Sequence, residues 1–362
     1  EGKRLNENYL TVKRIGAILG KLELRDLRDY HSLKHMYPRI PELKLIKRGI
    51  TKVPVLDVSE LPQVAKEIGL FPPMPFPLVF TLFTTKGGVL KTTLALNLAR
   101  VAALHGIRTC VVGLDMQGDV TKSLGMNAEL EGEDNLDFII SQLQKVKGLW
   151  NLYKGDANLE SLITPADIPN LYYIPETPEL TALSDALTLI NRREYWLREK
   201  VIRPLKEQFD LIIMDCSPNW NKLTTNALVA SDFLISPLEC KINNFRNFKV
   251  FWQFMNDFKK EMNLGLKTIF VPTRFSSQRK LSMEIKQWYE QNIPDCLATG
   301  IRESLQYEEA QAMYRSVLEY SRDSEILGEF AQLIRTLNNR LISHLPQTVY
   351  ASKTPQNNFA RV

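Results

Sequence analysis

Residues 86–93 read Lys-Gly-Gly-Val-Leu-Lys-Thr-Thr, a composition suited to binding phosphate. Glycine lets the backbone turn so that successive N–H groups point at one anion. The apolar run 78–84 predicts a strand before this loop, and a helix is predicted from Thr92 to about His105. A helix N-terminus adds partial positive charge. The pattern therefore predicts a nucleotide site in which Lys91 contacts the β- and γ-phosphates and the Thr92 hydroxyl ligates Mg²⁺.

The loop has a second lysine, Lys86, at its start. With it, the spacing KGGxxKT[ST] resembles the deviant Walker A motif of the ParA/MinD superfamily of ATPases. The resemblance implies ATP and ADP with Mg²⁺ as ligands, and a homodimer in which Lys86 reaches the phosphates held by the partner subunit. The expected nucleotide contacts of the loop are Lys86, Gly87, Gly88, Val89, Leu90, Lys91, Thr92 and Thr93.

A carboxylate, Asp115, follows the apolar run 109–114. The segment 114–121 resembles the DxDPQGN segment of the same superfamily, which implies that Asp115 orients the attacking water. Such a role suits phosphoryl transfer, which mostly needs positioning and charge stabilisation. Gly113 stands where that segment has its first aspartate, and Met116 stands where it has proline. Without the loop beside it, Asp115 would equally suit a helix cap or a turn.

A second carboxylate, Asp215, ends the apolar run that begins at Phe209. A buried strand of this kind places the acid at its C-terminal end, where it can hold Mg²⁺ directly or through water. The run resembles a Walker B strand, with Ser217 in place of a proline. Asn226 matches the Asn-Ala-Leu element of the superfamily and is expected to contact the nucleotide. Cys216 reads as a small core residue.

Short apolar runs without alternation, separated by helical stretches, predict a mostly parallel, doubly wound α/β sheet. Further strands are expected at 171–174, 211–214, 233–235 and 268–271. The resemblance extends to the segment 171–184 and covers residues 78–345, which we expect to form one ATPase domain.

Residues 1–70 are expected to form a small winged helix-turn-helix domain. Thr11 is placed to cap a helix that ends at Gly20, and residues 22–36 predict one or two more helices. Two strands are expected around a basic tip at 47–49, followed by a helix capped by Ser59. The alternative is a helical extension used only for packing or dimerisation. The proline-rich residues 71–77 predict a stiff linker, and residues 346–362 a polar tail.

Positive charge is concentrated at one end of the chain, whose overall net charge is +5. Residues 1–52 contain 13 Lys and Arg against 6 Asp and Glu, a net charge of +7, which leaves −2 for the remainder. This asymmetry indicates either a polyanionic partner or an ordinary solvated face. The cations considered as DNA contacts, each of which can equally be a solvated charge, are Lys47, Arg48, Arg274, Arg279, Lys280 and Arg315.

Several classes of protein are disfavoured. No apolar run approaches the roughly 18 residues of a membrane span, and Pro346 breaks the C-terminal segment where a membrane-targeting helix would be needed. The four cysteines are widely spaced without a CxxC pair, which favours a reduced, cytoplasmic protein over a disulfide scaffold or a zinc site.

Together these features resemble the DNA-segregating branch of the superfamily. The resemblance implies an ATP-hydrolysing partition protein, associated with the nucleoid, whose ATP-bound dimer binds DNA non-specifically. A ParB-type centromere-binding protein would stimulate its weak hydrolysis and release it, and the N-terminal domain would repress its own operator. Two alternatives stay open: a transcriptional regulator switched by nucleotide, and an ATPase that positions a protein cargo.

Overall fold

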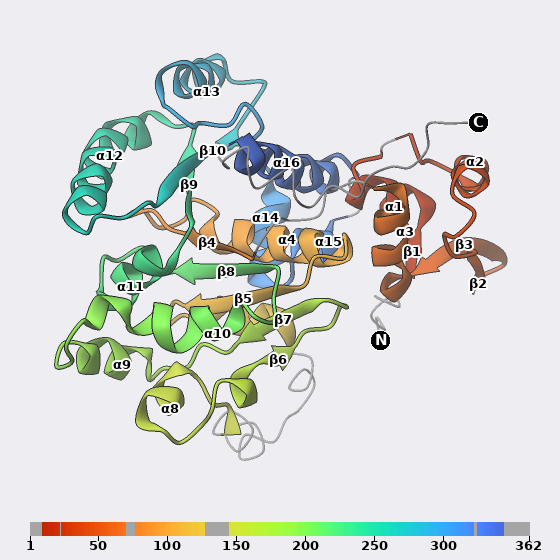
Figure 1. The fold of residues 1–362 in the computed structure, drawn as a ribbon. Coiled ribbons are helices and arrows are strands. Elements are labelled where there is room, and N and C mark those ends of the chain that lie inside the picture. The colour runs from red at the N-terminus through yellow and green to blue at the C-terminus, as the bar shows by residue number, and fades with distance from the viewer. Residues whose placement is uncertain (1–8, 22, 70–76, 127–144, 322–323, 344–362) are drawn as a thin grey trace, which may run out of the picture.

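The computed structural model describes residues 9–21, 23–69, 77–126, 145–321 and 324–343. It shows a small N-terminal unit beside a large α/β unit (Figure 1). The linker predicted at 71–77 lies outside the described residues except for Pro77, and so does the tail predicted at 346–362.

The large unit is built on one eight-stranded sheet in the order β11-β10-β9-β4-β8-β5-β7-β6. Every neighbouring pair is parallel except β6 with β7. The strands are β4 (Leu78–Leu82), β5 (Thr109–Leu114), β6 (Thr164–Pro165), β7 (Leu171–Ile174), β8 (Leu211–Cys216), β9 (Phe233–Glu239), β10 (Lys267–Phe275) and β11 (Ile301–Arg302). The predicted parallel α/β sheet is confirmed.

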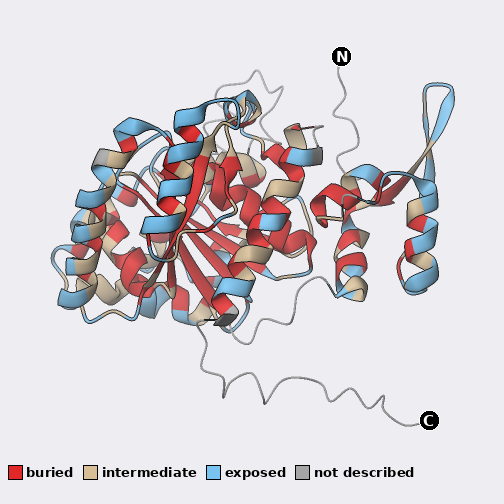
Figure 2. Cartoon of the chain, turned by 90° about the horizontal axis from the view of Figure 1, so that it is seen from above, coloured by how far each residue is buried: buried red, intermediate tan, exposed pale blue. Residues whose placement is uncertain are grey.

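Hydrophobic runs located the long strands well. The predicted strands at 109–114 and 171–174 coincide with β5 and β7, and the other four overlap β4, β8, β9 and β10. These strands are buried along almost their whole length, as Figure 2 shows for the centre of the sheet. The two edge strands β6 and β11 were not predicted, because a strand of two residues leaves no hydrophobic run.

Helices cover both faces of this sheet. On one face, α4 (Lys91–Leu104) and α16 (Ser324–Ser343) pack on inward residues such as Phe80 and Ile213. The opposite face packs on α9 (Leu180–Leu187), α11 (Lys222–Ala230), α12 (Ile242–Glu261) and α13 (Lys280–Asn292). The shorter helices are α5 (Asp119–Thr121), α8 (Leu149–Lys154), α10 (Arg203–Leu205), α14 (Leu305–Ala312) and α15 (Val317–Tyr320).

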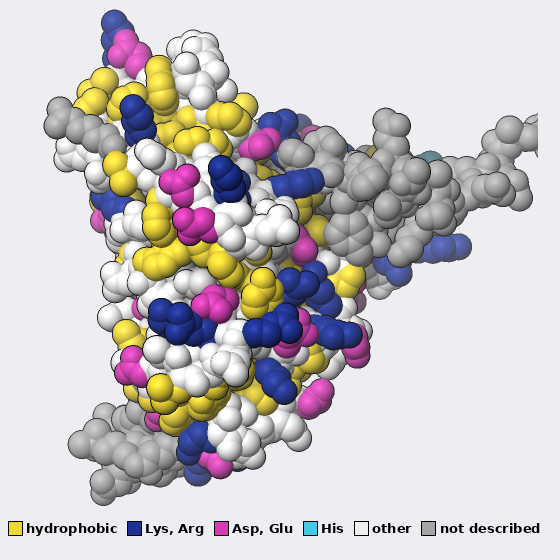
Figure 3. All heavy atoms as spheres, turned by 60° about the vertical axis from the view of Figure 1, so that its left-hand side comes forward, with side chains coloured by type: hydrophobic (Ala, Val, Ile, Leu, Met, Phe, Trp, Pro, Cys, Tyr) yellow, Lys and Arg dark blue, Asp and Glu magenta, His cyan; other side chains and the backbone are white. Residues whose placement is uncertain are grey.

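Helix α12 lies at the surface of the large unit. Its inner side buries Phe251 and Met255, whereas Val250 is 72% exposed and Phe254 43% exposed. Figure 3 views the molecule from this side, where hydrophobic side chains lie at the surface among charged ones.

The N-terminal unit contains a three-stranded antiparallel sheet in the order β1-β3-β2 together with three helices. Its elements are β1 (Tyr9–Thr11), α1 (Val12–Ile18), α2 (Leu27–Met36), β2 (Lys44–Arg48), β3 (Thr51–Asp57) and α3 (Leu61–Ile68). The β2–β3 hairpin projects from the body and is exposed (Figure 2). The order of helices, hairpin and helix is the predicted one.

The predicted helix caps differ from the structure. Thr11 directly precedes α1, but its side chain makes no capping hydrogen bond. Asp26 caps α2 by accepting hydrogen bonds from Arg28 N and Asp29 N, at 2.8 and 3.1 Å. The predicted cap by Ser59 is wrong, because Asp57 takes that part and accepts from Ser59 N at 2.9 Å. A 3₁₀ turn, Val58–Glu60, then leads into α3. The carboxylate of aspartate competes well for such positions, since it accepts from backbone N–H groups as readily as serine does.

The N-terminal unit shares a hydrophobic core with the large unit. Buried Ile15 and Ile18 of α1 belong to the same cluster as Phe330 of α16. The Arg335 guanidinium of α16 donates to the carbonyls of Leu19 and Gly20 at the end of α1. These carbonyls are the unsatisfied acceptors of a helix C-terminus, so the two units are joined by both apolar packing and helix capping.

His105 gives this core a pH dependence. It ends α4, is 6% exposed, and its Nδ1 lies 2.7 Å from the Val101 carbonyl. Burial, with a contribution from Arg335, lowers its pKa to about 4. Unfolding restores an ordinary pKa, so the unfolded chain binds more protons and stability is lost as pH falls below about 6.5. Relative to His105→Asn, the native chain should lose roughly 1 kcal/mol more between about pH 7.5 and about pH 5.5 in urea unfolding.

The exposed His31 on α2 provides the matched control. His31→Asn should keep the native pH dependence. Parallel stability curves for the native chain and His105→Asn would contradict this account of His105.

Candidate nucleotide site

The glycine loop connects the end of β4 to the start of α4, as the sequence predicted. Gly88 and Leu90 have φ of 71° and 69°, in the left-handed region that non-glycine residues rarely adopt. Val89 and Leu90 are buried and anchor the loop, whereas Gly87 and Gly88 are exposed. A Cβ atom added at either glycine would meet no heavy atom within 4 Å, so the backbone at both positions borders open space.

The first turn of α4 faces the end of β8. Thr92 Oγ1 donates to Asp215 Oδ2 at 2.6 Å. Asp215 is fully buried, which raises its pKa to about 7, although the Thr92 hydroxyl and the Lys91 ammonium oppose this rise. Lys91 is itself only 7% exposed. The predicted phosphate lysine and both predicted metal ligands therefore meet at one point.

The other oxygen of this carboxylate supports a cation site. Asp215 Oδ1 is buried and has no hydrogen-bond partner among the described residues. A buried oxygen without a partner is costly, and a hard cation such as Mg²⁺ would satisfy it. The open loop and the unsatisfied oxygen thus fit a Mg²⁺–nucleotide complex.

Asp115 lies at the same edge of the sheet. It follows β5, which pairs with β8 in a register that sets Gly113 opposite Asp215. Its Oδ1 accepts from Gln117 N at 3.1 Å, the turn contact that the alternative interpretation of this residue required. Asp115 is partly exposed, so this contact does not bury it.

Glu176 is a third carboxylate at this edge, and the sequence analysis gave it no role. It follows β7, is 7% exposed, and its Oε2 accepts from Val120 N and Thr121 N at 3.1 and 3.2 Å. Burial and the nearby charge of Asp215 raise its pKa to about 8, against the opposing backbone hydrogen bonds. The only signal in the sequence was an acid flanked by prolines, in Ile-Pro-Glu-Thr-Pro, directly after a strand.

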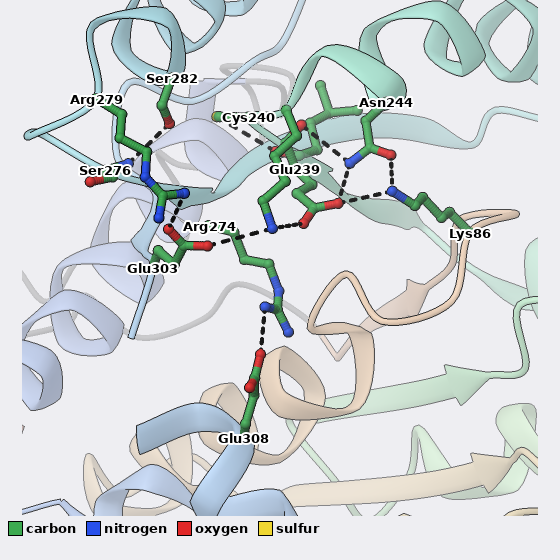
Figure 4. A network of polar contacts seen from close by, with 12 residues as sticks. Lys86, Glu239, Cys240, Asn244, Arg274, Ser276, Arg279, Ser282, Glu303 and Glu308 are labelled. Atoms are coloured by element: carbon green, nitrogen blue, oxygen red, sulfur yellow. Dashed lines mark hydrogen bonds and ion pairs between the residues drawn. The ribbon is translucent and has the colours of Figure 1, made fainter. Parts of the chain in front are cut away.

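Lys86 binds within its own chain. Its Nζ donates to Glu239 Oε2 at 3.0 Å and to Asn244 Oδ1, at the junction of β9 and α12 (Figure 4). Although Glu239 is largely buried, hydrogen bonds from Lys241, Lys86 and Asn244 lower its pKa to about 2. Lys86 is 40% exposed, so it lies at the surface of the loop with its charge paired.

Asn226 does not face the loop. It is 1% exposed, its Oδ1 accepts from Leu197 N at 3.0 Å, and its Nδ2 donates to the Lys222 carbonyl at 2.9 Å. With its amide committed to these backbone groups, Asn226 fixes α11 against residue 197. The predicted nucleotide contact through this residue has no support in its geometry.

The predicted DNA contacts of the large unit are divided in space. Arg274 is 16% exposed and pairs with Glu308 at 2.8 Å, whereas Arg279 is 66% exposed and pairs with Glu303 at 3.0 Å (Figure 4). Lys280 is 91% exposed at the start of α13. Of these three, Arg279 and Lys280 are the ones that an approaching polyanion would meet.

The other predicted DNA contacts lie elsewhere. Arg315 is half-buried and lines a small cavity with Thr92 and Thr93, on the side of the nucleotide loop. Lys47 is exposed on the hairpin of the N-terminal unit, and Arg48 is the last residue of β2.

Comparison with known proteins agrees with this geometry. A family described as AAA domain (AAA_31) matches residues 78–268, the region of the loop, Asp115 and Asp215. This chain belongs to that family, and it is a P-loop ATPase of the ParA/MinD type. The N-terminal unit lies outside the match.

Relatives and solved structures extend the comparison. The chain is 27% identical over 267 residues to the chromosome partitioning protein ParA of Myxococcus xanthus, covering 72% of this chain and 88% of that protein. It is 25% identical over 263 residues to the sporulation initiation inhibitor protein Soj of Bacillus subtilis, covering 70% and 96%.

Among structures, cobyrinic acid a,c-diamide synthase from Mycobacterium smegmatis with bound ADP and magnesium is 25% identical, with a TM-score of 0.56 and coverage of 74% and 95%. A plasmid partition protein from Borrelia burgdorferi shares the fold at 20% identity, with a TM-score of 0.54 and coverage of 75% and 100%. Within the described residues of this ATPase, no helix has the length and apolar character needed to cross a membrane.

The buried ammonium of Lys91 should dominate nucleotide affinity. A hydrogen bond to a charged group contributes about 1.5–3 kcal/mol, so Lys91→Ala should weaken binding of ADP by roughly 10- to 150-fold in calorimetric titration. Lys249→Ala, which removes an exposed lysine of α12, is the control and should bind as the native chain does. Equal affinities for Lys91→Ala and the native chain would remove Lys91 from the site.

Proposed function

We propose that this chain is an ATP-hydrolysing DNA partition protein that acts as an ATP-dependent dimer. The observation that supports it most is the meeting of Lys91 and Thr92, at the end of the glycine loop, with the buried Asp215 at one sheet edge. Two of its relatives are named for chromosome partitioning. The alternatives, a nucleotide-switched regulator and an ATPase for a protein cargo, share this site and differ in what it controls.

At the proposed site, the loop N–H groups and Lys91 hold the phosphates, while Thr92 and Asp215 hold Mg²⁺. Bound Mg²⁺ neutralises charge on the phosphates. Asp115 orients the attacking water, because its partly exposed carboxylate lies at the same edge as Asp215. These parts position and stabilise charge, which is what phosphoryl transfer requires.

Lys86 makes the site a dimer switch. Its cation is held by Glu239 and Asn244 in the single chain, so reaching a partner subunit means exchanging these contacts for a phosphate. A bond to the triphosphate offsets that loss, whereas the diphosphate offers less negative charge. We therefore infer that ATP favours the dimer and that hydrolysis returns Lys86 to Glu239.

DNA binding by the dimer is proposed to use Arg279 and Lys280, the exposed cations at the start of α13. An ion-pair chain runs from Lys86 through Glu239, Lys241 and Glu303 to Arg279 (Figure 4). When Lys86 moves to a phosphate, Glu239 keeps Lys241 as its cationic partner. Lys241 then pairs with Glu239 rather than with Glu303, which changes the charge around Arg279. This gives DNA affinity a route to depend on ATP.

The N-terminal unit is proposed to be a winged helix-turn-helix that binds the operator of its own gene. Arg25, Arg28 and His31 lie exposed at and along α2, and Lys47 and Lys52 are exposed on the hairpin. A helix with exposed cations beside a basic hairpin matches the groove-and-backbone division of labour of this motif. A ParB-type protein bound at a centromere-like site is the proposed partner that stimulates hydrolysis.

The central test is whether ATP controls binding to DNA of random sequence. With ATP and Mg²⁺ the native chain should form dimers and bind such DNA, and binding should weaken steeply with salt. Lys86→Ala should keep monomeric nucleotide binding but lose the dimer and the DNA complex. The double variant Arg279→Ala, Lys280→Ala should reduce the slope of log affinity against log salt by about 2, since each phosphate contact contributes about 0.9.

Lys200→Ala, at an exposed cation outside the proposed surface, is the control and should leave the slope unchanged. The proposal is overturned when ATP leaves DNA affinity unchanged. Phosphate release indistinguishable from buffer, with and without DNA, would instead favour the nucleotide-switched regulator.

Operator binding makes a separate prediction. Because the N-terminal unit shares its core with the large unit, point variants test it better than truncation. Arg28→Ala should weaken binding to the DNA upstream of the protein's own gene by about 1–3 kcal/mol. Lys47→Ala should weaken binding to all DNA sequences by a similar amount. The measurement is DNA footprinting with the full chain. A double variant that gives the native footprint would exclude this unit from operator binding.

A further inference from the structure

Gly113 occupies a demanding position in the sheet. It lies in β5 directly opposite Asp215 of β8, and neighbours in register on parallel strands direct their side chains to the same face. A side chain at 113 would therefore project beside the carboxylate proposed to hold Mg²⁺. Residue 113 has none, although its backbone conformation does not require glycine, since its φ is not among the positive ones.

The space beside Asp215 is filled from the next strand. A Cβ atom added to Gly113 would overlap the Cγ, Cδ and Oε1 atoms of Glu176. Strand β7 pairs with β5 up to Val112 and Ile174, so the chain beyond Ile174 passes Gly113 and turns Glu176 over it. The side chain of Glu176 can thus occupy this space only because residue 113 is glycine.

Glu176 also organises the loop that contains Asp115. Its Oε1 accepts from Asp115 N at 3.4 Å, and its Oε2 accepts from Val120 N and Thr121 N. In return, Glu176 N donates to Thr121 Oγ1 at 2.6 Å. Both ends of the segment from Asp115 to Thr121 are therefore tied to this one residue.

We propose that Glu176 is a positioning residue of the ATPase site, which places a second carboxylate beside Asp215 and fixes the backbone of Asp115 from a strand other than its own. The proposal rests on the proposed function for its reaction. It predicts that positions 113 and 176 are coupled: an acid is needed in this space, and only one of the two residues can provide it.

The experiment is a double-mutant cycle in the full chain. The variants are Glu176→Ala, Gly113→Asp and the two combined, with Glu176→Gln as the conservative variant. Glu179→Ala, at an exposed acid three residues away, is the control. Each is measured for urea unfolding, for ADP affinity with and without Mg²⁺, for hydrogen exchange at the amides of Asp115, Val120 and Thr121, and for kcat and KM.

Glu176→Ala should speed exchange at those three amides and reduce the gain in ADP affinity that Mg²⁺ provides. It should also lower kcat by on the order of 100-fold with little change in KM, as expected for a displaced catalytic group. Gly113→Asp alone should be destabilised by overlap with Glu176. Combined, the two changes should restore the Mg²⁺-dependent affinity and at least part of kcat. Glu176→Gln should keep most of the stability but reduce the Mg²⁺-dependent gain in ADP affinity.

A double variant no better than the worse single variant in both unfolding and Mg²⁺-dependent affinity would overturn the proposal. So would a Glu176→Gln variant identical to the native chain in its Mg²⁺-dependent affinity. Because unfolding, exchange and ADP affinity do not depend on turnover, they decide the role of Glu176 even where the native chain hydrolyses no ATP.

Discussion

The hydrogen bond from Thr92 to Asp215 is the contact on which the rest of the site depends. It joins the first turn of α4 to the C-terminal end of β8 inside the molecule, where a carboxylate without partners would be costly. The parallel pairing of β4 with β8 brings the two elements together, since it sets Leu82 opposite Asp215. The left-handed residues of the glycine loop then cover the short distance between β4 and α4. Strand order, loop shape and helix position together bring the Thr92 hydroxyl to the Asp215 carboxylate.

Local patterns predicted most of the fold and the centre of the site. Buried parallel strands are recognisable in the sequence as apolar runs, and the phosphate loop is one contiguous segment. Both could therefore be predicted without knowing any tertiary contact. The partners of Lys86 could not be found in this way, because Glu239 and Asn244 lie more than 150 residues away. The contacts of Glu176 could not be predicted either, because they too join segments far apart in the sequence. Its importance depends on an absent side chain at Gly113, and only the register of three strands reveals that dependence.

Predicted site residues outside the glycine loop show what a short sequence match leaves undecided. Asn226 was associated with the nucleotide through a short sequence match, but its amide is committed to two backbone groups inside α11 and beside it. Arg274 and Arg279 are separated by five positions in sequence, yet one is turned inward to Glu308 and the other lies exposed. A run of cations in a sequence says little about which of them meets a ligand, because exposure is decided by the elements that pack around each side chain.

The shared core of the two units has a mechanical consequence. Helix α1 is both packed on α16 and capped by Arg335, so the exposed face of α2 is held at a set angle to the nucleotide loop. In the dimer proposed above, each subunit would therefore hold its α2 helix in a fixed orientation. The distance between the two α2 helices, and with it the spacing of the DNA half-sites proposed to bind them, would then be set by how the two nucleotide sites meet.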